Sequence, residues 1–131
     1  MAYLQLSFPR IMKNLVILAS LHSILLGIIL IIAPHWLLNL FGWTIACDSF
    51  FLQQAGVFHV LLGLIYWREW YKHGSVFILA SAKISAAVFL TLNFIFAKPL
   101  LGVFLADAVD IFFGASAIFG WYRITKSNRR H

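Results

Sequence analysis

Charged side chains are scarce in this sequence, and acidic ones are the scarcest. Only 11% of its 131 residues are charged, with four Asp and Glu against ten Lys and Arg, while 63% are hydrophobic. An ordinary soluble domain is about one-quarter charged and about half apolar, so this composition excludes a water-soluble globular protein. The formal charge of +6 does not indicate a nucleic-acid partner, because most basic residues flank apolar runs, where they meet lipid headgroups.

Cysteine and the short motifs of catalysis are also nearly absent. Cys47 is the single cysteine, so an internal disulfide is excluded and no Cys/His spacing indicates zinc; we interpret it as a small apolar packing residue. The sequence contains no GxSxG, no HExxH and no phosphate-binding loop. We therefore expect a protein that is not an enzyme. An intramembrane enzyme built on His59, Asp107 and Asp110 is the alternative.

Long apolar runs are what the sequence has in abundance. Four of them cover about residues 13–33, 50–67, 75–97 and 100–122. At 1.5 Å per residue a helix of about 20 residues crosses a hydrocarbon layer of about 30 Å, and no run alternates as a barrel strand does. The first run is interpreted as a retained span, because it is long for a signal peptide and no small-residue cleavage site follows it.

These runs predict an all-α fold, a polytopic membrane protein in which residues 1–131 form one up-down bundle of four transmembrane helices. Between the first two runs lies an apolar, aromatic segment without Lys or Arg, which predicts a short interfacial helix in the headgroup layer. Its large side chains are Trp36, Leu37, Leu38, Leu40, Phe41 and Trp43. The other connections are short, so consecutive helices are expected to be antiparallel neighbours.

Positive charge is distributed unevenly between the two predicted sides of the membrane. Lys98 stands alone on one side, and eight basic residues stand on the other: Arg10, Lys13, Arg68, Lys72, Arg123, Lys126, Arg129 and Arg130. Lys and Arg in short loops stay in the cytoplasm, so we expect both termini there, in a membrane such as the bacterial inner membrane. An aromatic belt is expected at the same interface, formed by Tyr66, Trp67, Trp70, Tyr71, Trp121 and Tyr122.

Five ionisable side chains fall within the predicted spans, namely His22, His59, Lys83, Asp107 and Asp110. Such groups are costly in hydrocarbon and require a partner or a water-filled cavity. Counted from the inner end of each run, three of them lie about 12 to 14 Å deep and Asp110 about 18 Å. We therefore expect His22, His59, Lys83 and Asp110 to share one layer. Lys83 and Asp110 are expected to form an ion pair there.

Asp107 lies on the same helix face as Asp110, about one turn nearer the outer side. Gln53 and Gln54 fall at a similar depth, so one of them is expected to donate a hydrogen bond to Asp107. Asp107 has no cationic partner in this pattern. It is therefore also a candidate for a neutral carboxyl group in a proton relay.

Small residues flank the polar ones at helical spacing, which predicts close helix packing around them. The stripes are Gly56, His59 and Gly63 in the second run, Ala80, Lys83 and Ala87 in the third, and Asp107, Asp110 and Gly114 in the fourth, with Ser20, Ser23 and Gly27 beside His22 in the first. The polar side chains of all four runs are thus expected to face the interior of the bundle.

Several stretches together resemble a known family. They are GIILIIAP (27–34) followed by FGW, GVFHVLLGLIYW (56–67), the single Lys83 within the third run, and the late Asp pair. The layout is similar to the DoxX-like group of small four-helix membrane proteins. The resemblance implies the architecture and a setting near quinone or respiratory systems, and it assigns no functional residue.

The sequence favours the binding of a lipid, a quinone or another amphipathic small molecule in an intramembrane polar pocket, without a resident cofactor. The candidate ligand-binding residues are His22, Gln53, His59, Lys83, Asp107 and Asp110. A purely structural Lys83–Asp110 pair is one alternative. The others are an accessory or assembly subunit of a larger membrane complex, a homo-oligomer, and a haem b electron carrier with His22 and His59 as axial ligands.

Overall fold

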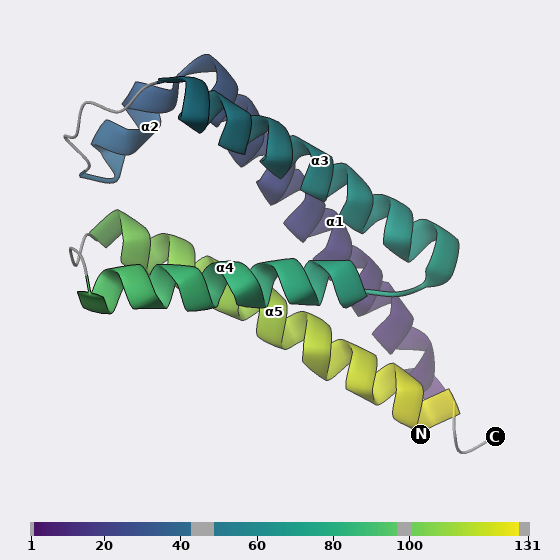
Figure 1. Ribbon diagram of the computed structural model, residues 1–131. Helices are drawn as coiled ribbons and strands as arrows, with labels where there is room; N and C mark the ends of the chain where they lie inside the picture. Colours follow the sequence, from purple (N-terminus) through teal and green to yellow (C-terminus); the bar gives the residue numbers. More distant parts are fainter. Residues whose placement is uncertain (1, 43–48, 97–100, 129–131) are drawn as a thin grey trace.

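The computed structural model describes residues 2–42, 49–96 and 101–128, and within these ranges it contains helices and no strand. The helices are α1 (Ala2–Ile32), α2 (Pro34–Leu40), α3 (Ser49–His73), α4 (Phe77–Phe96) and α5 (Leu101–Asn128) (Figure 1). The predicted all-α class is confirmed. The expectations for Trp43, Cys47, Lys98, Arg129 and Arg130 lie outside the described residues.

Four of these helices are long and apolar enough to cross a membrane, which confirms the predicted number. Their apolar stretches are Arg10–Ile32, Ser49–His73, Phe77–Phe96 and Leu101–Arg123. Helices α3 and α5 continue past the predicted ends at residues 67 and 122. Apolar length limits a membrane span, whereas helical hydrogen bonding continues through Arg, Glu, Lys and Trp, none of which interrupts a helix.

The segment after α1 forms the predicted short helix. Pro34 opens α2 and lacks the N–H needed to continue α1, so the chain changes direction at Ala33. Leu37 and Leu38 are buried, whereas Trp36 and Leu40 are exposed. Helix α2 therefore buries one face and exposes the other, although all four of these side chains are apolar.

The turn between α3 and α4 is fixed by two residues. Gly74 adopts a left-handed φ of 59° and its N–H donates to the Trp70 carbonyl oxygen at 2.9 Å, which ends α3. The Glu69 carboxylate accepts hydrogen bonds from the Ile78 N–H at 3.0 Å and from the Ser75 hydroxyl at 2.8 Å. Glu69 is buried, and it satisfies the Ile78 N–H group, which has no partner within the first turn of α4.

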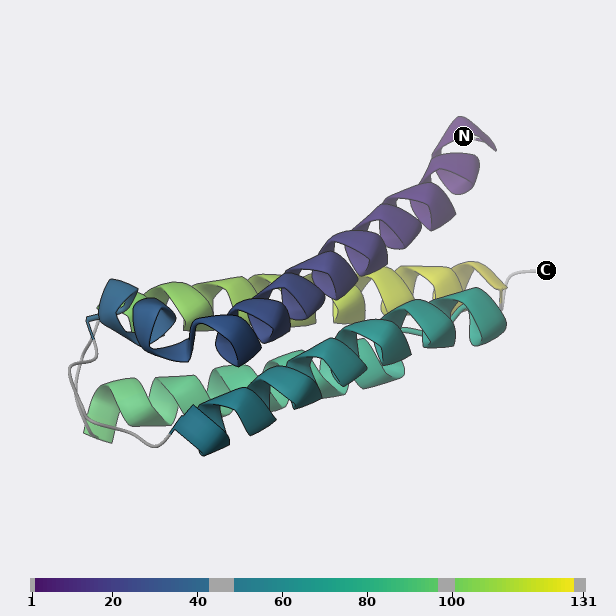
Figure 2. The same cartoon turned by 90° about the horizontal axis from the view of Figure 1, so that it is seen from above.

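The long helices form two pairs, α1 with α3 and α4 with α5. The pairs contact each other mainly through α1 and α5, and they diverge toward the end that carries α2 (Figure 1). The start of α1 and the end of α5 lie at the opposite end (Figure 2). The largest apolar core cluster contains residues from all four long helices: Met12, Val16, Ala19, Tyr66, Val76, Leu79, Ala80, Phe113 and Ala117.

Helices α1 and α3 approach each other closely because glycines line their contact. A Cβ atom at position 56 would lie 2.7 Å from the Gly27 carbonyl oxygen, and one at position 63 would lie 2.7 Å from the Ser20 carbonyl oxygen. A step of seven residues toward the end of α3 therefore corresponds to a step of seven residues toward the start of α1. The two helices run antiparallel with a heptad spacing, and their backbones touch at both levels.

Substitution of Gly63 by Leu is expected to lower the stability of the protein by at least about 1–3 kcal/mol, because a rigid backbone oxygen occupies the position of the new Cβ. Thermal unfolding of the purified protein in detergent measures the loss. Ala55→Leu is the matched control, since Ala55 lies on the exposed face of the same helix. Equal melting temperatures for the two variants would contradict the close α1–α3 contact.

Candidate functional site

The centre of the polar layer is an ion pair between α4 and α5. The Lys83 Nζ atom lies 2.6 Å from the Asp110 Oδ1 atom, and the two side chains are 4% and 12% exposed. The predicted pairing is confirmed. The Nζ atom also lies 5.7 Å from the centre of the Phe113 ring, which adds a cation–π contact. Removal of either partner would leave a single buried charge.

Small residues on both helices make this pair possible. Ala80 and Ala87 lie one turn to either side of Lys83 on the buried face of α4. On α5, a Cβ atom at Gly114 would lie 3.5 Å from the Lys83 Cβ atom. The stem of Lys83 therefore passes over a position without a side chain, one turn after Asp110, and its ammonium group reaches the carboxylate.

The two histidines, on the other helix pair, lie within electrostatic range of the same ion pair. His22 of α1 and His59 of α3 each interact electrostatically with both Lys83 and Asp110, and His59 also interacts with His22. Both side chains are partly buried. The four long helices thus each contribute one of these ionisable groups, as the depth count predicts.

Several buried polar atoms around the histidines have no hydrogen-bond partner within the described part of the chain. They are the Nδ1 atoms of His22 and His59 and the hydroxyl oxygens of Ser20 and Ser23. Nearly all buried polar atoms in proteins are hydrogen-bonded, so these four atoms are the candidate groups for binding a polar molecule. Ser20 and Ser23 were predicted only as small packing residues. Their position within one turn of His22 is the signal that connects them to the site.

Tyr66 also belongs near this layer, and its assignment to the aromatic belt is wrong. Only 2% of its surface is exposed, and it lies in the core cluster within electrostatic range of Asp110. A belt residue contacts headgroups, whereas Tyr66 falls on the face of α3 that carries Gly56 and Gly63. Its i+3 spacing from Gly63 could have shown this from the sequence.

The expected hydrogen bond from Gln53 or Gln54 to Asp107 is not formed. The Thr91 hydroxyl of α4 donates to the Asp107 Oδ2 atom at 2.8 Å, and the Gln53 Nε2 atom donates to the Ile31 carbonyl oxygen of α1 at 3.2 Å. Gln53 and Asp107 do not meet although they lie at a similar depth. Helix α3 packs on α1 and helix α4 packs on α5, so the two residues belong to different helix pairs. Asp107 is buried, and its Oδ1 atom has no partner among the described residues.

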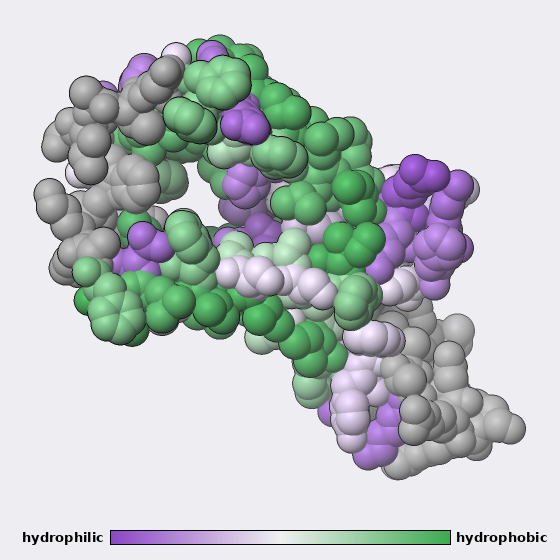
Figure 3. Space-filling view, in the orientation of Figure 1, coloured by the Kyte–Doolittle hydropathy of each residue, from purple (hydrophilic) through white to green (hydrophobic). Residues whose placement is uncertain are grey.

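A hollow separates the two helix pairs on the side where they diverge (Figure 3). Hydrophilic atoms are visible on its inner wall, whereas the surface around it is largely hydrophobic. The hydrophilic wall of the hollow thus adjoins apolar surface. This arrangement is suited to a molecule with a polar head and an apolar body.

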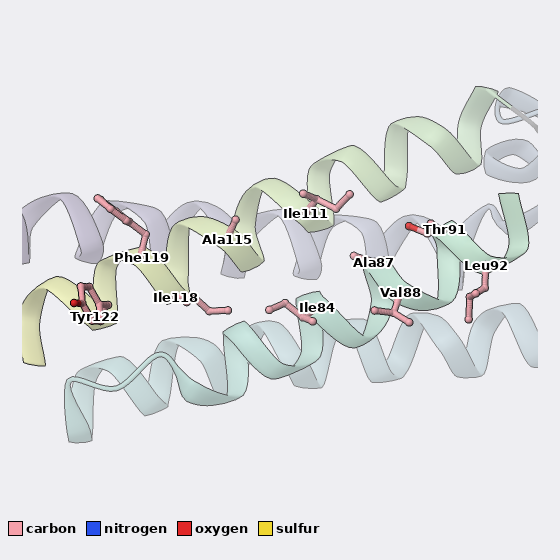
Figure 4. A pocket seen from close by; sticks show the side chains of 10 residues that line it. All are labelled: Ile84, Ala87, Val88, Thr91, Leu92, Ile111, Ala115, Ile118, Phe119 and Tyr122. Carbon is pink, nitrogen blue, oxygen red and sulfur yellow. The ribbon is translucent and has the colours of Figure 1, made fainter. Parts of the chain in front are cut away.

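A second recess is a groove of about 750 Å³ formed by α4 and α5 alone (Figure 4). Its lining is almost entirely apolar and consists of Ile84, Ala87, Val88, Thr91, Leu92, Ile111, Ala115, Ile118, Phe119 and Tyr122. The Thr91 hydroxyl, one of its two polar groups, donates to Asp107. The groove thus offers hydrocarbon contacts and little hydrogen bonding.

Comparison of the chain with protein-family models, with curated proteins and with solved structures found no match.

Lys83→Met and Asp110→Leu are each expected to destabilise the protein by about 3–5 kcal/mol, because each leaves one buried charge without its partner. The double variant K83M/D110L removes both charges and keeps apolar volume, so it should recover most of the loss. Thermal or chemical unfolding of the four proteins in detergent completes this double-mutant cycle. Additive losses in the double variant would show that the ion pair does not link α4 to α5.

Proposed function

We propose that this chain is an integral membrane protein whose four long helices cross the bilayer in alternating directions, with both termini in the cytoplasm of a cell such as a bacterium. Two observations support the proposal. The helices expose many large apolar side chains, such as Leu25, Phe58, Phe89 and Phe112, which suit lipid rather than water. The start of α1 and the end of α5 lie at one end of the molecule, where the basic residues concentrate.

The proposed topology has a direct test. Reporter domains that are active only in the cytoplasm are expected to work when fused to either terminus, and to fail when inserted after Gly42, near the end of α2. Exchange of Arg10, Lys13, Arg68 and Lys72 for Gln should weaken this preference, because basic residues retain short loops in the cytoplasm. Activity of a reporter at Gly42 with inactive terminal fusions would reverse the orientation.

The function proposed for the polar layer is the binding of the head of an amphipathic small molecule, such as a lipid or a quinone, without catalysis. The observation that carries this proposal is the convergence of His22 and His59 on the Lys83–Asp110 pair. Lys83 and Asp110 engage each other, whereas the Nδ1 atoms of His22 and His59 have no partner among the described residues. A neutral imidazole can donate at one nitrogen and accept at the other.

The character of the ligand follows from the same residues. The ion pair carries no net charge, so the site favours a neutral head with hydrogen-bond acceptors or donors over a free ion. Ser20 and Ser23 add hydroxyl groups on the α1 side of the layer. Asp107, with one carboxylate oxygen unpaired, and the exposed Gln53 lie on the side toward α2, where the helix pairs diverge.

Replacement of both histidines by Phe is expected to reduce the amount of ligand that co-purifies with the protein by roughly ten- to thirty-fold, which corresponds to the loss of two hydrogen bonds of about 1 kcal/mol each. Mass spectrometry of an organic extract from the detergent-purified protein measures this amount. His73→Phe is the control, because His73 lies exposed at the end of α3. The double variant K83M/D110L should also lose the ligand while it keeps its fold.

Retention of the same compound by the wild type and by H22F/H59F would contradict the proposed site. The same purified sample distinguishes the other candidate functions. A haem carrier would show Soret absorption that disappears in H22F/H59F, and an accessory subunit would remain in a larger complex in mild detergent.

A further inference from the structure

The α1–α3 contact changes character at its third heptad level. The close approaches at Gly27–Gly56 and Ser20–Gly63 use small residues. Seven residues further along each helix, the same register places Lys13 opposite Trp70. A cavity of about 230 Å³ lies between the two helices at this level. It is lined by Lys13, Val16, Ile17, Trp67, Trp70 and Tyr71.

The residues that line this cavity are rich in hydrogen-bond donors and contain no acidic side chain. Among the lining residues, Val16 is buried and Trp70 is partly buried. Lys13, Trp67 and Tyr71 are exposed. An ammonium group, two indole N–H groups and a phenol O–H group are all hydrogen-bond donors. None of the six lining residues is acidic.

Nearby charges strengthen the preference for an anion. Arg10 precedes Lys13 by one helical turn, and Arg68 follows Trp67 on α3. Glu69 is the one acidic side chain on that helix, and its carboxylate is bound to the Ser75 hydroxyl and the Ile78 N–H at the start of α4. Within the described part of the chain, no carboxylate forms an ion pair with Lys13.

The position of the cavity along the helices indicates which anion. Lys13 and Trp67 mark the ends of the apolar runs of their helices, where a membrane changes from hydrocarbon to headgroups. Val16 and Ile17 continue the wall one turn deeper, toward the hydrocarbon. Trp and Tyr favour this level of a bilayer, and the cytoplasmic leaflet carries anionic lipids.

We propose that this cavity binds the phosphate headgroup of an anionic phospholipid of the cytoplasmic leaflet. Lys13 meets the phosphate, the Trp67, Trp70 and Tyr71 side chains surround the glycerol region, and Val16 and Ile17 contact the first carbons of an acyl chain. The inference rests on the proposed membrane insertion, and it is independent of a ligand at His22 and His59.

The test is native mass spectrometry of the full-length protein from mixed micelles with equal amounts of phosphatidylglycerol and phosphatidylcholine. The wild type is expected to retain one phosphatidylglycerol molecule in preference to phosphatidylcholine. Lys13→Gln should reduce this preference about five-fold or more. Lys72→Gln is the matched control, because it removes the same charge from the same end of the molecule outside the cavity lining, and it should keep most of the preference.

Three outcomes would overturn the proposal. They are an unchanged preference in K13Q, an equal loss in K72Q, which would indicate diffuse surface charge, and displacement of the lipid by millimolar inorganic phosphate, which would indicate a site for soluble phosphate. H22F/H59F should retain phosphatidylglycerol, because the histidines lie outside this cavity. A failure of the function proposed for the polar layer is therefore distinguishable from a failure of the lipid site. Failure of the wild type to float with vesicles of either lipid would instead contradict membrane insertion. Thermal unfolding of K13Q confirms that the variant is folded.

Discussion

Two opposite charges buried between α4 and α5 are the constraint on which the rest of this structure depends. Neither Lys83 nor Asp110 could lie in an apolar interior alone, and together they fix the register of one helix against the other. Gly114 and the alanines on α4 allow the helices to come close enough for the pair to form. His22, His59 and Tyr66 lie within electrostatic range of this pair.

The sequence predicted the features that depend on position along a helix. Apolar length alone indicated four helices, and counting residues from the inner ends placed His22, His59, Lys83 and Asp110 at one level. Glycines and alanines at i+3 and i+4 indicated which faces pack. Each of these inferences uses only the rise and the period of an α-helix. Both are the same in every α-helix, so they apply as soon as a helix is assigned.

The features that depend on neighbours could not be predicted in the same way. Gln53 and Asp107 share a depth, yet they belong to different helix pairs, and depth does not report which helices touch. Thr91 is an ordinary threonine until α4 lies beside α5 and its hydroxyl meets Asp107. Glu69 resembles a charged loop residue, and only the turn at Gly74 brings the start of α4 back to its carboxylate.

The ion pair has a further consequence in a membrane that carries an electrical potential. An isolated charge inside the field would change in energy by up to about 2.3 kcal/mol per 100 mV. Lys83 and Asp110 are 2.6 Å apart and opposite in sign, so their contributions to this energy almost cancel. In the membrane orientation proposed above, the pair would therefore respond little to a change in the membrane potential.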